Sequence, residues 1–348
     1  MAFAQLFGPH GLRLTCGMLL LAAGLALVRP PAAAACDVCA VYTVEELGEI
    51  RHGPRIGIAE QFTHFGTTLE DSQEVPNPND EFLNSSFTQF ALGWRFTDWI
   101  DAQLVIPMIH RSWRRNFDGA VQEESRTGIG DIAALARVRA YSAQNERGLL
   151  RLSGYGGLTF PSGDTSFLAE ELEETGAEIR PPWERPAHAG SGHAPSHEDA
   201  SAIHGHDLTF GTGSVNGIIG AEFFGSWDRF LASADIQYTL YTEGAHDYQF
   251  ANELIFRGGI GYYLWLADEG SFAIQGVVSG DTKGQDEQRG ETLGDTAATY
   301  VFAGPRLLGR WGSSLSLDAG VQIPFIRHET DLQIAPDWRV QAALAWKF

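Results

Sequence analysis

Apolar and polar residues alternate along most of the chain beyond residue 55. In the last segment, Trp338, Val340 and Leu344 fall on one face, whereas Arg339 and Gln341 fall on the other. A period of two is typical of a β-strand whose two faces meet different surroundings. Because the same region shows no helical period of useful length, the pattern predicts an all-β protein.

Twelve segments of this kind can be counted. They cover residues 55–63, 86–97, 100–112, 129–142, 148–161, 214–226, 229–241, 249–264, 271–280, 297–310, 313–327 and 337–348. Every second connection is a short turn, and most of the others are longer, up to residues 162–213. An even number of strands with short turns at one end and long loops at the other is typical of outer-membrane barrels. The sequence therefore predicts a closed antiparallel up-and-down transmembrane β-barrel, with 12 strands, over residues 55–348.

A soluble β-sandwich would show the same alternation, but two features favour the barrel. Five tryptophans lie at or beside the short turns, where a barrel carries an interfacial aromatic girdle: Trp99, Trp227, Trp265, Trp311 and Trp346. The inward face also holds charges, Arg95 and Asp101 among them, that the dry core of a sandwich would exclude. The inward charges that we expect to set the selectivity of a watery lumen are Arg137, Arg139, Arg151, Arg257, Arg339, Asp131, Asp235 and Asp318.

The first 35 residues have the layout of a secretory signal peptide. Arg13 precedes an apolar stretch over residues 14–28, and an alanine run ends at Ala35. Cleavage there makes Cys36 the first residue of a periplasmic segment, 36–54. Lipidation of Cys36 is the alternative, which Ala33 disfavours because a lipidation signal usually has leucine at that position.

A C-x-x-C pair, Cys36 and Cys39, opens this periplasmic segment. In an oxidising compartment such a pair can form a local disulfide, bind a soft metal or exchange thiols. We expect the disulfide. Covalent haem attachment is excluded because Ala40, and not histidine, follows the second cysteine.

The net charge of −20 argues against nucleic-acid binding. Nearly all of the negative charge lies in the long connections, which face outward in bacterial barrels while the short turns face the periplasm. This acidic rim either attracts cations to the mouth or only keeps the surface hydrated. The chain then ends in the periplasm at Phe348, which we expect to be the insertion signal that the barrel-assembly machinery reads.

Histidines gather in the longest loop, 162–213, at His188, His193, His197, His204 and His206. Imidazole is a common metal ligand, so this tract could collect a weakly bound divalent metal. The alternative is a polar loop without a ligand, and no cofactor is required in either case.

One pair of residues suggests an enzyme. His110 and Ser112 are two apart and would share a strand face, as in some outer-membrane lipid hydrolases. A nucleophile also needs an orienting third group and an oxyanion hole, and neither can be identified here. We therefore expect no enzymatic activity.

Three glycine-rich motifs carry a family resemblance. They are Gly128-Ile-Gly-Asp131, Leu158-Thr-Phe-Pro-Ser-Gly163 and Phe210-Gly-Thr-Gly-Ser214, preceded by Ile106-Pro107. Their order resembles an outer-membrane family named for the meta-pathway of phenol degradation. The resemblance implies a small barrel that passes aromatic or other hydrophobic substrates, and it supplies no catalytic residues. The acidic, histidine-bearing insert before Phe210 and the C-x-x-C pair depart from that family.

These observations predict a channel in the cell outer membrane for the passive passage of a small solute, hydrophobic or aromatic if the resemblance holds. The expected partners are outer-membrane lipid, the barrel-assembly machinery and the solute. One alternative is a metal-handling protein that uses the histidine loop and the C-x-x-C pair. A second is a structural barrel that tethers partners through its acidic loops. Whether the lumen is open depends on loops 64–85 and 162–213 folding inward or outward.

Overall fold

The computed structural model describes residues 52–117, 119–170 and 201–348. The predicted signal peptide, the C-x-x-C pair and three histidines of the longest loop (His188, His193 and His197) lie outside these residues. Predictions that concern them are therefore not tested by the structure.

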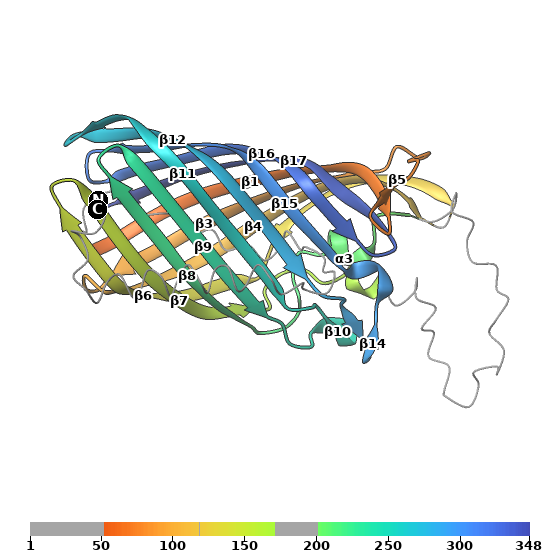
Figure 1. The fold of residues 1–348 in the computed structure, drawn as a ribbon. Helices are drawn as coiled ribbons and strands as arrows, with labels where there is room; N and C mark the ends of the chain where they lie inside the picture. Colours follow the sequence, from red (N-terminus) through yellow and green to blue (C-terminus); the bar gives the residue numbers. More distant parts are fainter. Residues whose placement is uncertain (1–51, 118, 171–200) are drawn as a thin grey trace, which may run out of the picture. The chain divides into compact units, whose positions relative to one another are not determined.

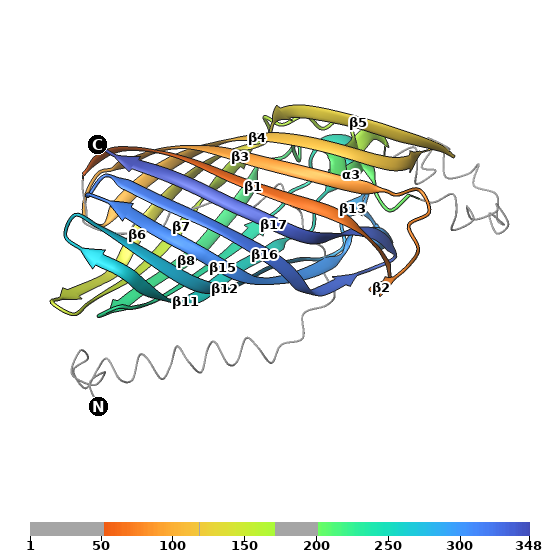
Figure 2. The same cartoon turned by 90° about the horizontal axis from the view of Figure 1, so that it is seen from above.

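Twelve antiparallel strands form a closed barrel (Figures 1 and 2). They are β1 (Gly53–Glu70), β3 (Phe82–Arg95), β4 (Ile100–Phe117), β6 (Ile132–Asn145), β7 (Gly148–Phe160), β8 (Asn216–Trp227), β9 (Phe230–Leu240), β11 (Glu253–Ala267), β12 (Gly270–Lys283), β15 (Ala298–Trp311), β16 (Leu315–Glu329) and β17 (Leu332–Lys347). Each strand pairs with its neighbours in sequence, and β17 pairs with β1. This last pairing leaves the barrel without an open edge, so the predicted architecture is confirmed.

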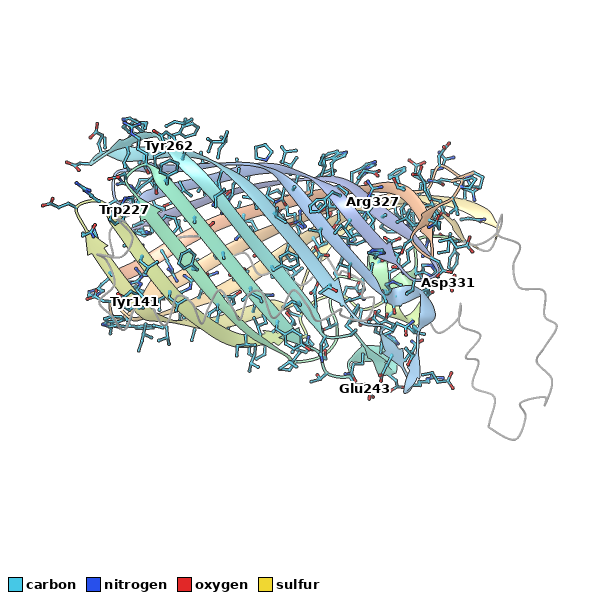
Figure 3. All side chains as sticks on the ribbon, viewed as in Figure 1. Tyr141, Trp227, Glu243, Tyr262, Arg327 and Asp331 are labelled. Atoms are coloured by element: carbon cyan, nitrogen blue, oxygen red, sulfur yellow. The ribbon has the colours of Figure 1, made fainter. Side chains whose placement is uncertain are left out.

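The two faces of the strands separate apolar from polar residues as predicted. On β17, Leu344 and Trp346 are exposed on the outer surface, while Arg339 and Lys347 are buried inside the barrel. The inner end, defined by the short turns, carries exposed aromatic residues, and Trp227, Tyr141 and Tyr262 lie there in Figure 3. A closed sheet with an apolar outer surface and an aromatic girdle identifies an outer-membrane barrel.

The structure differs from the predicted strands mainly at the opposite, outer end. An additional strand, β5 (Ala120–Ile129), pairs with the outer half of β4. Residues 330–331 alone connect β16 to β17, so the predicted loop over 328–336 was wrong. The strand β5 was missed because it is mostly polar and shows no alternation. The start of β17 was missed because Gln333, Ile334 and Ala335 are consecutive buried residues, which also gives no alternation.

Several short elements complete the outer end. They are β2 (Gln73–Glu74), α3 (Gly205–Leu208), η4 (Ala245–Asp247), β10 (Tyr248–Gln249), β13 (Glu287–Gln288), β14 (Glu291–Thr292) and η5 (Gly294–Thr296). Among the described residues, no helix is long and apolar enough to cross a membrane.

Phe348 directly follows β17 at the inner end, where its amide donates to the Pro54 carbonyl at 3.2 Å. Its side chain is exposed on the outer surface of the barrel. The position suits an exposed terminal signal, and recognition by the barrel-assembly machinery stays a prediction.

Candidate functional site

The two described ends of the longest loop fold into the outer end of the barrel. We call these residues, 161–170 and 201–214, the plug; its short helix α3 lies at that end in Figures 1 and 2. Ile203 and Leu208 of the plug are completely buried against Leu83 and Trp113 of the barrel wall. The open question about loop 162–213 is therefore answered for its described parts, which fold inward.

Charged side chains of the wall bind the backbone of the plug. The Arg111 guanidinium donates to the Thr209 carbonyl at 2.8 Å and also to the Asp207 carbonyl. The Glu81 carboxylate accepts from the Ala202 amide at 2.9 Å. Both side chains are buried, and hydrogen bonds to charged groups are stronger than those between neutral ones. The plug is thus held by specific polar contacts as well as by apolar packing.

Asp131 joins the two ends of the plug to the start of β6. One carboxylate oxygen accepts from the amides of Ser162 at 3.1 Å and Gly163 at 2.9 Å. The other accepts from the Thr212 amide at 2.8 Å and the Thr212 hydroxyl at 2.7 Å. Asp131 therefore anchors both ends of the plug to the barrel wall, a role that the sequence did not suggest. The selectivity role predicted for it stays a prediction.

The three glycine-rich motifs meet at this carboxylate. A Cβ atom on Gly163 would lie 2.6 Å from the Cα of Gly211, so the two plug ends can touch only where both residues lack side chains. A Cβ on Gly128 would collide with the Phe210 ring in the same way. Close approach of backbones is a recognised reason for glycine in such positions.

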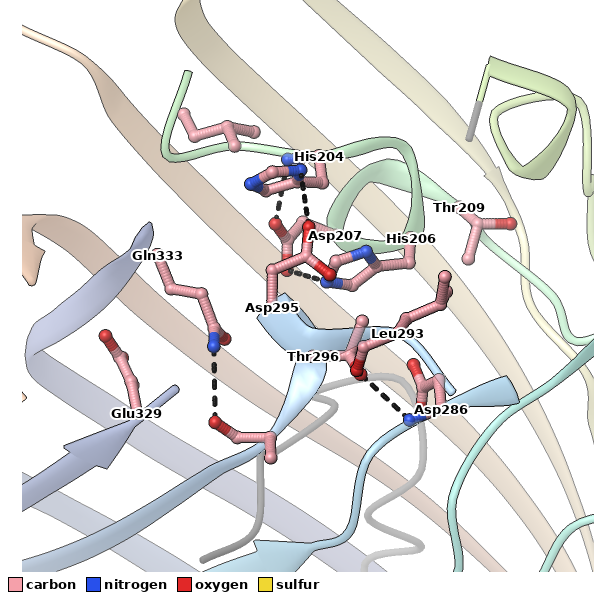
Figure 4. Close-up of polar contacts among 12 residues, drawn as sticks. His204, His206, Asp207, Thr209, Asp286, Leu293, Asp295, Thr296, Glu329 and Gln333 are labelled. Carbon is pink, nitrogen blue, oxygen red and sulfur yellow. Dashed lines mark hydrogen bonds and ion pairs between the residues drawn. The ribbon is translucent and has the colours of Figure 1, made fainter. Parts of the chain in front are cut away.

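Of the two described histidines of the loop, His204 is the N-cap of α3 and His206 lies within this helix (Figure 4). His204 Nδ1 is 3.4 Å from Asp295 Oδ2, and His206 Nε2 is 3.5 Å from Asp207 Oδ1. The two rings stack with centroids 5.6 Å apart. Within residues 52–117, 119–170 and 201–348, no group of three or more His, Cys, Asp or Glu residues could hold a metal ion. Metal collection by this loop stays a prediction.

Glu329 is a buried carboxyl next to the plug. It ends β16, beyond the last apolar residue of the outer surface, and accepts a hydrogen bond from the Tyr300 hydroxyl. Burial raises the pKa of Glu329 from 4.5 to about 7; the nearby Asp207 also raises it, while Tyr300 and Arg327 oppose the rise. Glu329 therefore changes charge near neutral pH.

We expect the outer end of the barrel to lose stability as the pH rises from about 4.5 to 7. In that window the unfolded chain releases the Glu329 proton while the folded chain keeps it, so the free energy of unfolding falls. At about 1.4 kcal/mol per pKa unit, the free energy of unfolding falls by about 2–3 kcal/mol across this pH window. Urea unfolding of the refolded protein at pH 5 and pH 8 measures it, and Glu329→Gln should remove this part of the slope. An unchanged slope in the variant would contradict the assignment.

Below the plug, the lumen contains a small central chamber of about 80 Å³. Three residues predicted to set selectivity line it: Asp235, Arg257 and Arg339. Arg339 donates to Gln322 Oε1 at 2.8 Å and lies 3.6 Å from Asp281 Oδ1. The chamber wall is therefore polar and carries both signs of charge.

A charged network lines the lumen nearer the inner end. Asp101 contacts three guanidinium groups: that of Arg55, that of Arg95 at 3.1 Å and that of Arg137 at 3.9 Å. Arg137 also donates to Glu222 at 3.0 Å. Arg139, which donates to a backbone carbonyl of the inner turn, and Arg151 are buried in the same region.

Asp318, on the opposite wall, binds Arg306 through both carboxylate oxygens at 2.9 and 2.8 Å. The sequence did not single out Arg306, because Gly304 and Pro305, directly before it in the middle of β15, interrupt the alternation. Glu222 was missed for a similar reason, since two adjacent phenylalanines follow it. Arg55, another member of the Asp101 network that the sequence did not single out, is the third residue of β1.

His110 and Ser112, the candidate catalytic pair, lie on the outer surface of β4. His110 Nδ1 bonds the Thr127 hydroxyl at 2.7 Å, and Ser112 accepts from the Asn84 amide at 3.2 Å. These contacts tie both residues to neighbouring strands, and the absence of enzymatic activity stays a prediction.

No family model matches the chain, and no curated protein is similar to it in sequence. Among solved structures, an outer-membrane channel from Pseudomonas putida F1 superposes with a TM-score of 0.57 and 14% identity, over 89% of this chain and all of that one. The β-domain of the Bordetella autotransporter BrkA (TM-score 0.40, 10% identity, 86% of this chain and all of that one) is more distant. The monoaromatic hydrocarbon channel CymD is also more distant, with a TM-score of 0.36 and 6% identity over 86% of this chain and 89% of that one. The similarity to the Pseudomonas putida channel supports the barrel fold. The TM-scores of the other two structures are too low to support any inference.

Proposed function

We propose that the protein is an outer-membrane channel for the passive passage of small, apolar or aromatic solutes, and that the plug closes it at rest. The observation that carries the proposal is the apolar character of the plugged part of the lumen. Polar solutes would lose hydrogen bonds there, whereas apolar solutes would find matching surfaces.

Apolar side chains continue from the rim toward the central chamber. On the inner side of the apolar cluster that contains Ile203 and Leu208, the plug residue Phe210 packs against Phe87 and Ile109 of the wall. Phe87 also lines the central chamber. An aromatic solute that replaces plug side chains along this path regains about 1.5–3 kcal/mol of apolar burial. The part of the path between the rim and Phe87 therefore favours apolar over polar molecules of equal size.

Passage requires the plug to move, because its side chains are packed directly against the wall at the outer end of the barrel. The wall and the plug meet through the Asp131, Arg111 and Glu81 contacts and the Arg115–Glu170 ion pair at 2.6 Å. They also share three apolar clusters, which contain Ile203, Leu168 and Phe210 of the plug. Such a set of contacts can be released without breaking the barrel, whose strands are paired independently of the plug.

The other two hypotheses, metal handling and tethering of partners, gain no supporting observation from the described part of the chain. Membership of the family named for the meta-pathway of phenol degradation stays a prediction. The meeting of its three motifs at Asp131 is in keeping with it.

Uptake of an apolar dye by intact cells tests the proposal. The lipopolysaccharide leaflet slows entry of N-phenyl-1-naphthylamine, whose fluorescence rises when it reaches an apolar environment. Gram-negative cells that produce the protein should take up this dye several-fold faster than cells with an empty vector. Uptake of a disaccharide should not change. Equal dye uptake with a correctly inserted barrel would reject the proposal.

A further inference from the structure

One carboxylate lies on the outer, lipid-facing surface of the barrel. Glu60 of β1 is paired with Thr88 of β3, and its carboxylate accepts hydrogen bonds from the hydroxyls of Ser86, at 2.6 Å, and of Thr88. Phe87 and Gln89, which alternate with these two residues along β3, are buried and line the central chamber. Because successive side chains of a strand point to opposite faces, Ser86, Thr88 and the Glu60 carboxylate are on the outer surface.

Glu60 also lies deep within the apolar band of this surface. It is four residues beyond Ile56, which is paired with Trp346 of the inner aromatic girdle. At about 3.4 Å per residue and a strand tilt of about 40°, Glu60 is about 10 Å further into the membrane. The apolar band of such barrels is about 25 Å tall. The carboxylate is therefore near the middle of the band, and the aromatic pair Phe62–Trp338 lies between it and the outer end.

A carboxylate at this depth is unfavourable where lipid covers it. Acyl chains offer no hydrogen bonds, and ionisable residues within a membrane mostly face protein or water and mark functional sites. The two hydroxyls occupy two of the roughly four positions at which a carboxylate can accept a hydrogen bond. A protein surface placed over Glu60 could exclude the lipid and supply further hydrogen bonds.

The surface beside Glu60 is low enough for another barrel to approach. Ala342 of β17 is paired with Glu60, and Ala319 of β16 is paired with Ala342. Along β17, Val340 and Leu344 are exposed on either side of Ala342. Small residues between larger apolar ones allow close contact between proteins in a membrane. The patch thus combines a shallow apolar surface with one polar centre.

A second copy of the chain matches the depth of this polar centre. Two copies in one membrane have the same orientation, so a two-fold axis along the membrane normal brings the same residues face to face at the same level. With the axis beside Glu60, the carboxyl groups of the two copies meet and can share one proton in a hydrogen bond, as paired carboxyl groups do in aspartic proteases.

We propose that the outer surface of β16, β17, β1 and β3 around Glu60 is the interface of a homodimer in the outer membrane. The interface removes the two Glu60 carboxyl groups from lipid and packs the alanine surfaces of the copies together. It involves neither the lumen nor the plug, so the inference does not depend on the proposed function.

Distances between spin labels test it. In a protein with Cys16→Ser, Cys36→Ser and Cys39→Ser, a nitroxide label is attached at Ala342→Cys, and double electron–electron resonance in dilute liposomes measures the distance between two copies. We expect a distance below about 25 Å, about one barrel diameter. Ala234→Cys is the matched control, because Ala234 is an exposed alanine of β9, on the opposite wall and near the inner end of its strand. Labels there should be more than about 40 Å apart, because both barrels lie between them.

Two variants of Glu60 test the part played by its carboxyl group. Leucine suits lipid, so the Glu60→Leu barrel should fold, and its population with the short distance at position 342 should fall at least about fivefold. Glu60→Gln should retain most of that population, because two amides can pair across the axis. No defined distance at position 342, equal distances at positions 342 and 234, or a short distance that persists in Glu60→Leu would overturn the inference.

Discussion

Asp131→Ala is expected to open the outer end of the barrel and to raise the uptake of N-phenyl-1-naphthylamine. The substitution removes the acceptor of four hydrogen bonds that tie both ends of the plug to the wall. Three backbone amides lose their acceptor, at a cost of about 1–3 kcal/mol for each one that stays buried. A loss of only 1.4 kcal/mol would raise the open population tenfold, so we expect at least about tenfold faster uptake if plug opening limits it.

Two further variants control for this result. Asp268→Ala removes an exposed carboxylate from an inner turn and should leave uptake unchanged. Asp131→Asn keeps an oxygen acceptor but turns an NH₂ group toward amide donors, so its uptake should be intermediate. Unchanged uptake in a folded Asp131→Ala barrel would show that this carboxylate does not control closure.

Asp101→Asn is expected to destabilise the barrel most strongly among the lumen charges. Asp101 is 4% exposed and is the carboxylate shared by Arg55, Arg95 and Arg137. Removing one partner of a buried ion pair typically costs about 3–5 kcal/mol because the remaining charge stays buried. We therefore expect the free energy of urea unfolding to fall by about 3 kcal/mol.

The matched comparison is Glu222→Gln. Arg137 would then still lie 3.9 Å from Asp101, so the loss should be smaller than for Asp101→Asn. Equal losses in the two variants would contradict the central place given to Asp101 in the network.

Most of the barrel could be predicted from the sequence because lipid on one side and polar side chains on the other impose an alternation on every spanning strand. The clear pattern of Trp338, Val340 and Leu344 marks a strand whose inner part was found correctly, although it begins five residues earlier than predicted. The pattern weakens where a strand leaves the membrane. This is why β5 was missed and the β16–β17 loop was placed too widely.

The functional region was harder to predict because it depends on contacts between distant segments. Asp131 was identified as an inward charge, but its bonds to Gly163 and Thr212 arise only when both ends of a long loop return to the same strand. Glu81 and Arg111 belong to no periodic pattern that would mark a plug contact. The glycine motifs were a usable signal, since their glycines proved to be sites of close backbone approach.

The central claim, that the plug closes the barrel at rest, is tested most directly by ion conductance in planar bilayers. The wild-type protein is compared with a variant in which a short Gly-Ser linker replaces residues 165–208, so that most of the plug is missing while Asp131 and the strands remain. We predict a low conductance for the wild type and a steady conductance at least about tenfold higher for the variant. Equal conductance of the two proteins would contradict the account.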